Sequence, residues 1–529
     1  MPHWCSIGEN ELFPSVAWRL LLPDPAPGDI VVLGNGQTAR SARSALGARE
    51  PGANDRAAGR GADLAVGEAI DPETLRELVA ALRPGGTAYV ELDWPRAHRT
   101  ESAIAALLAE GFESVRAYSL SPSGDRWEAS WWVPIGEPST FRFVAASRRP
   151  AGTSAVGAAA RRLLVGAVER CASQLSGHPW LLHPRRGQRL GLVASLPGPD
   201  GSGSTGPGLA VRALAAAGVA GHPDGGPAPL ALLRVGGSST DQPMLFVFPP
   251  GASEPSVVVK APDCQEEVAA QARESTILHW LAANDGPVPN IPLPVTIQPD
   301  LPFPVGAYVF VPGRPLTELA SPASLESLAT AVSDWLAALA EGTRRAVGPG
   351  WYQTMIDELF DDLAGDLGPV SGGRFDLERA RAIVEGLDPG FTVCQHRDLG
   401  PWNVHHDERT GIGVIDWADA EPSGPPVCDQ LHHLVHLAVC STDGYRPDRL
   451  DATLSAVVDP GTDIGKLVDR CIARFSNRIG LDRATIPQLR VLTWLIDLQR
   501  QDPAQRAGSL YARLLAHELR RLPTAADRA

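Results

Sequence analysis

Acidic and amide side chains are concentrated in one stretch of the sequence, residues 393–422, "VCQHRDLGPWNVHHDERTGIGVIDWADAEP". Asp398, Asn403 and Asp416 lie near the ends of short apolar runs, so we expect them to project from adjacent loops. Carboxylate and amide oxygens are suitable ligands for Mg²⁺, which also keeps water and substrate phosphates as ligands. A carboxylate that does not bind the metal could orient a hydroxyl and accept its proton. This division of roles suits phosphoryl transfer.

The spacing of these residues resembles that of a known family. "HRDLGPWN" matches the H-x-D-x-x-x-x-N catalytic-loop pattern, and "VIDW" stands where protein kinases have D-F-G. Together with "GIGVIDWADAEPSGPPVCDQLHHL", the stretch resembles the aminoglycoside phosphotransferase and choline kinase branch of the protein kinase-like superfamily. Arg397 stands where this branch commonly has Gly, and Gln430 follows Asp429 where Leu is usual. We interpret the second change as structural.

The resemblance implies a role for each polar residue of the loop. Asp398 would orient the acceptor hydroxyl and accept its proton, which makes it the expected catalytic residue. Asn403 and Asp416 would hold Mg²⁺ on the phosphates. His396, placed in the catalytic group because it begins the motif, would support the loop through hydrogen bonds and would not act as a base.

The same resemblance predicts a phosphate-pairing lysine on an upstream strand and an acid on the next helix. Lys260 ends the strand-like segment "SVVVK", where this lysine is expected. Glu274 precedes the apolar face of the following helix and is the preferred ion-pair partner, with Glu266 and Glu267 as alternatives.

Two further segments are expected to contact the nucleotide. The turn at residues 236–242 would cover the phosphates, with backbone N–H groups and a hydroxyl from Gly236, Gly237 and Ser238. The strand "AYVFVPGRPL" resembles the hinge between the two lobes of a kinase. The backbone near Phe310 and Val311 would receive the base.

Changes of pattern along the 529 residues predict several folding units. We expect an α/β, Rossmann-like domain at residues 1–150, followed by a helix and flexible linker at 151–228. A bilobal α+β protein kinase-like domain would follow, with its N-lobe at 229–312 and its mostly helical C-lobe, including the catalytic loop, at 313–529. Gly/Pro/Ser-rich runs such as "PGPDGSGSTGPG" favour the linker.

The first domain alternates strand-like and helix-like segments, which indicates a largely parallel sheet. Asp71 is placed to cap a helix, and residues 140–150 are expected to form a last strand. Over residues 28–149 the order of elements resembles the second half of a class I S-adenosylmethionine-dependent methyltransferase. Gly34 and Gly36 could form the cofactor-binding turn of that family. Because the ribose-binding acid has no obvious place, we favour a degenerate structural domain over S-adenosylmethionine binding.

Composition narrows the range of partners. The net charge of −14 argues against binding to nucleic acid, because such binding depends on clustered Lys and Arg. Seven scattered cysteines without a C-x-x-C pair favour a reducing, cytoplasmic environment. The sequence shows neither a signal-peptide pattern nor a long apolar run, so we expect no membrane partner. It does not indicate an oligomeric state.

A zinc site is the competing interpretation of the same region. Cys428, His432 and His436 recur every four residues on one side of an expected helix. The outer two would lie about 12 Å apart on a straight helix, so the three could not bind one ion, although two of them with an outside ligand could. Buried or substrate-facing histidines are therefore favoured.

These observations predict an ATP- or GTP-dependent, magnesium-requiring enzyme that phosphorylates a hydroxyl group of a small molecule. An aminoglycoside-, choline- or sugar-like acceptor would fit the resemblance. Two alternatives remain open at this point. The chain could be a nucleotide-binding pseudokinase that acts as an interaction module, or a bifunctional protein with an active N-terminal methyltransferase.

Overall fold

The computed structural model describes the greater part of the chain. The described residues are 16–50, 61–93, 100–121, 130–146, 189–199, 207–219, 230–235, 242–262, 265–283, 290–295, 304–366 and 376–522. The helix expected within residues 151–188 and the site residues Gly236, Gly237 and Ser238 lie outside them. The chain divides into two compact units, the first being Met1–Gln271 with Pro294–Phe310 and the second Ala272–Leu293 with Val311–Ala529.

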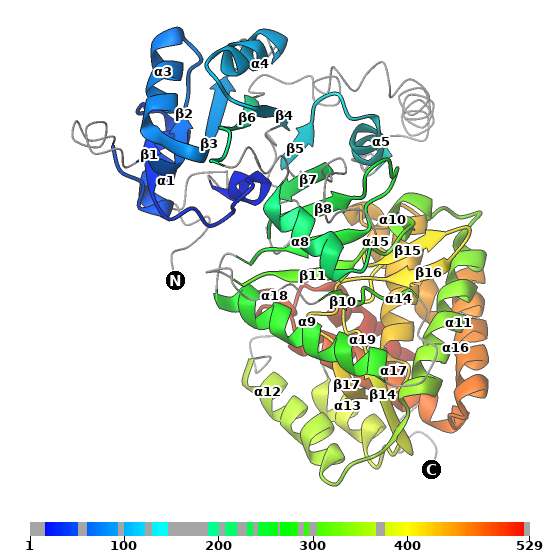
Figure 1. Ribbon diagram of the computed structural model, residues 1–529. Coiled ribbons are helices and arrows are strands. Elements are labelled where there is room, and N and C mark those ends of the chain that lie inside the picture. The colour runs from blue at the N-terminus through cyan, green and yellow to red at the C-terminus, as the bar shows by residue number, and fades with distance from the viewer. Residues whose placement is uncertain are drawn as a thin grey trace, which may run out of the picture. The chain divides into compact units, whose positions relative to one another are not determined.

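One 11-stranded sheet runs through the described part of the first unit (Figure 1), in the order β1-β2-β3-β6-β4-β5-β7-β8-β9-β11-β10. Its strands are β1 (Ile30–Val32), β2 (Ala62–Gly67), β3 (Leu82–Asp93), β4 (Ser114–Ser121), β5 (Ser130–Pro134), β6 (Arg189–Ser195), β7 (Leu230–Val235), β8 (Met244–Phe248), β9 (Val257–Lys260), β10 (Pro294–Val295) and β11 (Gly306–Val309).

The direction of pairing changes along this sheet. Strands β1, β2 and β3 are parallel, as the alternating pattern predicts, and the remaining pairs are antiparallel. Strand β6, from the segment expected to link two domains, inserts between β3 and β4. Strand β5 then pairs with β7, with Trp131 opposite Arg234. The segments expected to form the Rossmann-like domain and the kinase-like N-lobe therefore share one hydrogen-bonded sheet.

Helices cover both faces of the sheet, since both faces are apolar. One face forms a single core that extends from Ile30 on β1 to Ala307 on β11 and includes the stacked rings of Trp18 and Tyr89, 4.1 Å apart. The other face carries separate cores around Leu78 and around Phe246. The helices of this unit are η1 (Ala17–Leu21), α1 (Gln37–Leu46), α3 (Pro72–Ala81), α4 (Thr100–Ala109), α5 (Pro138–Ala146) and α8 (Gly208–Ala216).

Two local features of this unit bear on the sequence predictions. Asp71 caps α3 as expected, because its carboxylate accepts a hydrogen bond from Thr74 N at 2.9 Å. Residues 140–146 of the strand expected at 140–150, by contrast, belong to helix α5 (Pro138–Ala146), and residues 147–150 lie outside the described residues. Phe141 and Val144 lie one helical turn apart and are both buried. Their packing at helical spacing outweighs the strand-like alternation that suggested the wrong element.

The second unit is mostly helical, and Figure 1 shows α11, α14 and α16 side by side within it. Helix α9 (Gln265–Ala283) begins in the first unit and continues into the second. The remaining helices are α10 (Leu316–Leu319), α11 (Leu325–Thr343), η4 (Gln353–Asp357), α12 (Glu358–Asp366), α13 (Leu377–Val384), α14 (Cys428–Ser441), α15 (Pro447–Val458), α16 (Asp463–Ile479), η6 (Arg483–Thr485), α17 (Ile486–Gln499), α18 (Pro503–Arg506) and α19 (Leu510–Arg521).

Two three-stranded sheets, β12-β15-β16 and β13-β14-β17, position the polar stretch within this unit. Their strands are β12 (Arg314–Pro315), β13 (Arg345–Ala346), β14 (Phe391–Gln395), β15 (Val404–Asp407), β16 (Gly411–Val414) and β17 (Glu421–Gly424). The loop between β14 and β15 carries Asp398 and Asn403, and Asp416 follows β16. These short strands confirm the expectation that the polar residues project from strand ends.

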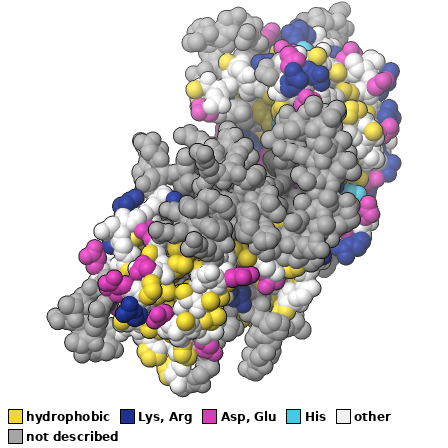
Figure 2. All heavy atoms as spheres, turned by 90° about the horizontal axis from the view of Figure 1, so that it is seen from above, with side chains coloured by type: hydrophobic (Ala, Val, Ile, Leu, Met, Phe, Trp, Pro, Cys, Tyr) yellow, Lys and Arg dark blue, Asp and Glu magenta, His cyan; other side chains and the backbone are white. Residues whose placement is uncertain are grey.

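On the face shown in Figure 2, the described Asp and Glu side chains lie among Lys, Arg and apolar side chains. The described residues of that face thus form no field of a single sign, although the whole chain carries a net charge of −14. None of the helices that the structure describes is long and apolar enough to cross a membrane.

Candidate active site

His396 contacts main-chain atoms of the loop and of the segment that carries Asp416. The ring is fully buried, and its Nε2 lies 2.9 Å from the carbonyl oxygen of Ile415. Its Nδ1 accepts a hydrogen bond from Asp398 N at 3.3 Å, so Nε2 must carry the proton. Both ring nitrogens are therefore engaged with the main chain, and the ring joins the loop to the segment that carries Asp416.

Asp429 fixes the start of the loop from the first turn of α14. Its two carboxylate oxygens accept hydrogen bonds from His396 N at 2.6 Å and from Arg397 N at 2.9 Å. Arg397 has a positive φ of 68°, a conformation that is unusual for a residue other than Gly. Its side chain forms an ion pair with Glu421. The Arg at the position where Gly is common is thus held at both its main chain and its side chain.

Asp398 is the partly exposed carboxylate at the centre of the loop. Its Oδ2 accepts a hydrogen bond from Asn403 Nδ2 at 2.9 Å and a longer one from Trp402 Nε1 at 3.4 Å. Asn403 Nδ2 also donates to the Asp398 carbonyl oxygen at 2.9 Å. Gly400 gives the Trp402 indole its place, because a Cβ there would lie 2.2 Å from the ring. The loop thus orients Asp398 through Oδ2 and leaves the Asn403 amide oxygen for another ligand.

Asp416 lies close to Asn403 along the main-chain hydrogen bonds. Ile415 N donates to the Asn403 carbonyl oxygen at 2.9 Å, which places the next residue, Asp416, beside the loop. Asp416 has a φ of 67° and is half-buried. An amide oxygen and a carboxylate on adjoining segments are hard oxygen donors, and they fit Mg²⁺, which needs only one or two carboxylates when phosphates complete its shell.

Glu274 on α9 is connected to the segment after Asp416 within the second unit. Its side chain is 2% exposed, and Oε1 accepts a hydrogen bond from Trp417 N at 3.2 Å. Arg273 also donates to the Ala418 carbonyl oxygen at 3.3 Å. Of the three acids considered on this helix, Glu274 is thus the buried one that contacts the site segment.

Lys260 lies on a strand of the first unit, and the hinge residues Phe310 and Val311 directly follow strand β11. Lys260 ends β9 opposite Met244 and Gly306, and its ammonium lies 5.4 Å from the centre of the Tyr308 ring. Phe310 N donates to the Ser256 carbonyl oxygen at 2.9 Å. Val311 belongs to the second unit and is buried.

A cluster of aromatic and imidazole side chains is linked to Asp398 through Trp402, and spacing in the sequence did not predict this cluster. The rings of Trp402 and His436 lie 5.0 Å apart. His436 contacts two tyrosine hydroxyls, that of Tyr445 at 2.6 Å from Nδ1 and that of Tyr511 at 3.1 Å from Nε2. Tyr445 is 49% exposed, whereas burial holds the pKa of His436 well below its usual value. Burial raises the pKa of Tyr511, and Asp497 and Asp398 raise it further.

The histidines of α14 have separate partners. His433 Nδ1 lies 3.1 Å from the Leu399 carbonyl oxygen, and burial lowers the pKa of this ring to about 4. His432 contacts Asp497, and Cys428 accepts a hydrogen bond from Thr493 at 3.3 Å. In the part of the chain that the structure describes, no group of three or more His, Cys, Asp or Glu side chains is arranged to hold a metal ion.

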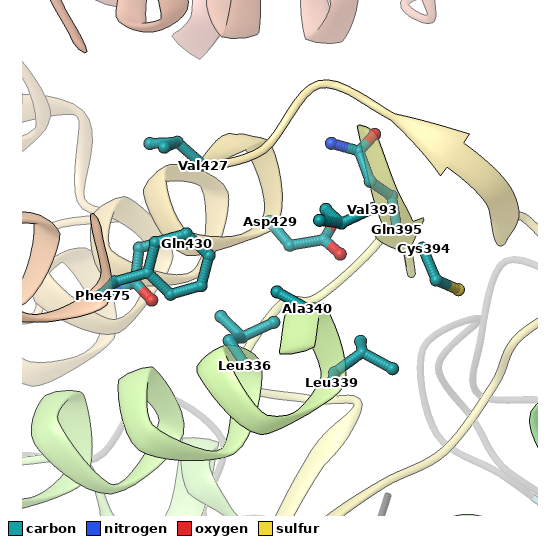
Figure 3. A pocket seen from close by; sticks show the side chains of 10 residues that line it. All are labelled: Leu336, Leu339, Ala340, Val393, Cys394, Gln395, Val427, Asp429, Gln430 and Phe475. Atoms are coloured by element: carbon teal, nitrogen blue, oxygen red, sulfur yellow. The ribbon is translucent and has the colours of Figure 1, made fainter. Parts of the chain in front are cut away.

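A small cavity lies beneath the catalytic loop (Figure 3), where side chains from α11, β14, α14 and α16 meet. Its volume of about 10 Å³ corresponds to one water molecule at most. The Asp429 carboxylate and the Gln430 side chain line it among apolar groups. Gln430 donates to Ser333 Oγ at 2.6 Å, which places the residue that replaces Leu in a buried polar contact. This cavity belongs to the support of the loop and is too small for a substrate.

Part of the chain that includes the loop matches the model of a known protein family. Residues 250–467 match the model of the phosphotransferase enzyme family, APH. Residues 250–467 thus resemble a phosphotransferase-family domain. The matched segment contains Lys260, Glu274 and the whole polar stretch, and the predicted enzyme class, a kinase acting on hydroxyl groups, is confirmed with the family. The family match does not extend to residues 1–249, so the methyltransferase-like domain stays a prediction.

Several solved structures match about half of this chain. The streptomycin–ATP complex of APH(2″)-IIa is 18% identical, with a TM-score of 0.30, and covers 50% of this chain and 84% of its own. APH(3″)-Id from Streptomyces rimosus, in complex with ADP and streptomycin, is 16% identical, with a TM-score of 0.29, and covers 53% of this chain and 94% of its own. Choline kinase LicA from Streptococcus pneumoniae is 13% identical, with a TM-score of 0.32, and covers 53% of this chain and 91% of its own. A search of curated proteins found no matching relative.

Proposed function

We propose that the protein transfers the γ-phosphate of ATP or GTP to a hydroxyl group of a small molecule. The observation that carries this proposal is the arrangement around Asp398. Asn403 and Trp402 hold its Oδ2, while the carboxylate keeps 39% of its surface exposed. A carboxylate that is fixed on one side and open on the other can receive a substrate hydroxyl in a defined orientation.

The chain's own groups divide the work of this reaction. Asp398 binds the acceptor hydroxyl through Oδ1 and accepts its proton as the oxygen attacks phosphorus. Asn403, through its amide oxygen, and Asp416 hold Mg²⁺. The ion, when bound, neutralises charge on the phosphate oxygens. His396 keeps the Asp398 and Asp416 segments in register, since it bonds to the main chain of both.

The nucleotide-binding roles rest on the resemblance together with local contacts. Lys260 pairs the non-reacting phosphates, and the main chain near Phe310 and Val311 receives the base. Glu274 positions Lys260 and also holds the Trp417 main chain next to Asp416. Gly236, Gly237 and Ser238 are assigned to the phosphate-covering turn from the sequence. The choice between ATP and GTP is left to nucleotide-binding measurements.

The acceptor is proposed to bind against the aromatic side of Asp398. Trp402 and Tyr445 offer apolar ring surface, and the tyrosine hydroxyls are joined through His436. Such rings can pack against an alicyclic, sugar-like or quaternary-ammonium acceptor, whose hydroxyl would then face Asp398. These groups support a compact organic acceptor and do not distinguish aminoglycoside-, choline- and sugar-like compounds.

For the N-terminal domain we propose a structural role. Glu68 enters the Gly-rich turn that was considered for S-adenosylmethionine, and its Oε1 accepts a hydrogen bond from Ala39 N at 3.1 Å. A Cβ at Gly36 would lie 1.9 Å from Glu68 Oε2, so the glycine accommodates this internal carboxylate. Titration of the full chain with S-adenosylmethionine in a calorimeter should give no binding heat. Stoichiometric binding would restore the bifunctional alternative.

The phosphotransferase proposal is tested with Asp398→Ala. Purified full-length protein is screened for nucleotide turnover against a panel of hydroxylated metabolites, and the variant is compared on any acceptor found. We expect at least a 1,000-fold loss of kcat, in the range that removal of a positioned base and its substrate contact causes. Nucleotide binding should remain within about threefold, because Asp398 is not assigned to the phosphates. Activity equal to that of the wild type would contradict the mechanism.

A further inference from the structure

A buried histidine faces the catalytic carboxylate from the side opposite to its known supports. His432 lies on α14 with 5% of its surface exposed. Its Nδ1 is 3.2 Å from Asp497 Oδ2 on α17. Its Nε2 is 4.0 Å from Asp398 Oδ1. The ring therefore stands between two carboxylates that are 99 residues apart in the sequence.

The protonation of the ring follows from its contacts. A carboxylate accepts hydrogen bonds, so the contact with Asp497 requires a proton on Nδ1. Burial by itself would lower the pKa of His432, but Asp497 and, to a smaller degree, Asp398 and Asp429 raise it above 6.5. The ring consequently carries protons on both nitrogens over a wider pH range than an ordinary histidine.

The second nitrogen of this ring is left without a hydrogen bond. Nε2 is buried and has no partner among the described residues, although buried polar atoms are usually satisfied. The nearest acceptor is Asp398 Oδ1, which lies about 1 Å beyond hydrogen-bonding distance. Contacts of this kind are often long without substrate and shorten when it binds.

We propose that His432, held by Asp497, is a positioning residue that donates a hydrogen bond from Nε2 to Asp398 Oδ1 when the acceptor binds. This inference rests on the proposed function and adds a residue pair to it. Asn403 and Trp402 hold Oδ2, so His432 fixes the remaining oxygen, which has a second lone pair for the acceptor hydroxyl. Both carboxylate oxygens of Asp398 are then held by hydrogen bonds before the proton of the acceptor hydroxyl is transferred. His432 exchanges no proton with the substrate.

Several other titratable groups surround His432 and enter any interpretation of its pH dependence. They are Asp398 in the loop, Asp497 on α17, Tyr511 on α19, and Asp429, His433 and His436 on its own helix. Of these, the two histidines have lowered pKa values and stay neutral near pH 7. The two aspartates that contact the ring remain the groups to vary.

The first test measures the electrostatic coupling between His432 and Asp398, which lie 4.0 Å apart without any acceptor. Full-length protein labelled at histidine is titrated by NMR, and the pKa of His432 is compared in wild type, Asp497→Asn and Asp398→Asn. We expect a value above 6.5 in wild type, a fall of at least one pH unit in Asp497→Asn and a smaller but measurable fall in Asp398→Asn. An unchanged pKa in Asp398→Asn would overturn the proposed contact.

The second test separates positioning from structural support by using two isosteric variants. Asn at position 432 can keep the donor to Asp497 but has no atom at the place of Nε2, whereas Gln can reach Asp398. With MgATP as the probe and water as the acceptor, we expect His432→Asn to lower kcat at least tenfold, with the KM for MgATP within twofold. His432→Gln should recover at least one third of the wild-type kcat. Equal kcat in the two variants would overturn the positioning role.

A control and a check on the underlying function complete the design. His517→Gln removes an imidazole on α19 that contacts Arg520, and it should leave both kcat and the pKa of His432 unchanged. A change in either would mean that the effects at His432 are not specific and would count against the proposal. If wild type and Asp398→Ala turn over MgATP equally, the proposed function fails, whereas the NMR titration still decides the contact between His432 and Asp398.

Discussion

At the scale of single residues, Asp429 supports the catalytic loop from helix α14 through hydrogen bonds to His396 N and Arg397 N. Replacing it with Asn should weaken the two hydrogen bonds to His396 N and Arg397 N, because an amide offers one acceptor oxygen and presents N–H groups to the other donor. We expect a loss of about 2 kcal/mol in the free energy of unfolding, typical of hydrogen bonds to a charged group. Denaturant unfolding measures this loss.

The matched control for that change is Asp448→Asn, on the exposed side of α15, where Asp448 contacts Arg446. This substitution should change the unfolding free energy by less than about 0.5 kcal/mol. A similar loss in both variants would show that the Asp429 contacts do not stabilise the loop.

His433 predicts a particular dependence of stability on pH. The ring has a pKa of about 4 in the folded chain, lowered by burial from 6.5. Between these values the unfolded chain binds more protons than the folded one, so stability is lost as the pH falls from about 6.5 toward 4. The full effect of this one ring is roughly 3 kcal/mol. His433→Asn should show a shallower loss in urea unfolding between pH 7 and 4, and an unchanged slope would contradict the assignment.

Asp398, Asn403 and Asp416 could be proposed from the sequence because their spacing is a local pattern within residues 398–416. Asp398, Asn403 and Asp416 lie where strands end, and the family match covers all three. The spacing gave no comparable signal for Asp497 or Tyr511. These residues reach the loop only through the packing of α14, α17 and α19, and helix packing between distant segments leaves no fixed spacing in the sequence.

At the scale of elements, a buried ion pair joins α17 to α19. Arg490 and Glu518 are 3% and 0% exposed at their side chains, with Nε and Oε1 2.5 Å apart. Glu518→Gln should cost about 3 kcal/mol, because it removes the buried counter-charge of Arg490 and leaves that guanidinium only the more exposed Asp469, 3.3 Å away. Glu341→Gln breaks an exposed pair between α11 and α16 with Arg478, and it should cost less than about 1 kcal/mol.

Thermal and denaturant unfolding of these two variants measure the difference. Equal losses of unfolding free energy in the two variants would indicate that burial does not determine how much each ion pair stabilises the protein. Binding of nucleotide should be unchanged in both variants, since neither pair contacts the catalytic loop.

The elements that were predicted well are those with strong local signals. Helix α3 has an N-cap at Asp71, and strands β7, β8 and β9 are short runs of apolar residues. Strand β6 was missed because it lies among Gly- and Pro-rich segments and its burial on both faces depends on β3 and β4. The error at α5 has the same origin, since Phe141 and Val144 pack on a sheet that the local sequence does not reveal.

At the scale of the whole molecule, the pairing of β5 with β7 predicts that the phosphotransferase-family domain depends on the N-terminal segments. A fragment of residues 229–529 would expose the backbone edge of β7, which pairs with β5 through residues 130–132 in the full chain. Open strand edges promote aggregation. We expect this fragment to be mostly aggregated in size-exclusion chromatography, under conditions where the full chain is not. A monodisperse, nucleotide-binding fragment would contradict the prediction.

The continuous apolar core on one face of the 11-stranded sheet also has a consequence for how the first unit unfolds. Elements that share one core and one hydrogen-bond ladder lose their protection together. Amides on β2 and on β9, although they belong to segments that the sequence assigned to different domains, should therefore exchange with solvent deuterium through the same opening event. A substitution near β2 should therefore shift the melting temperature, measured by calorimetry, of the unit that also contains β9, the strand that ends at Lys260.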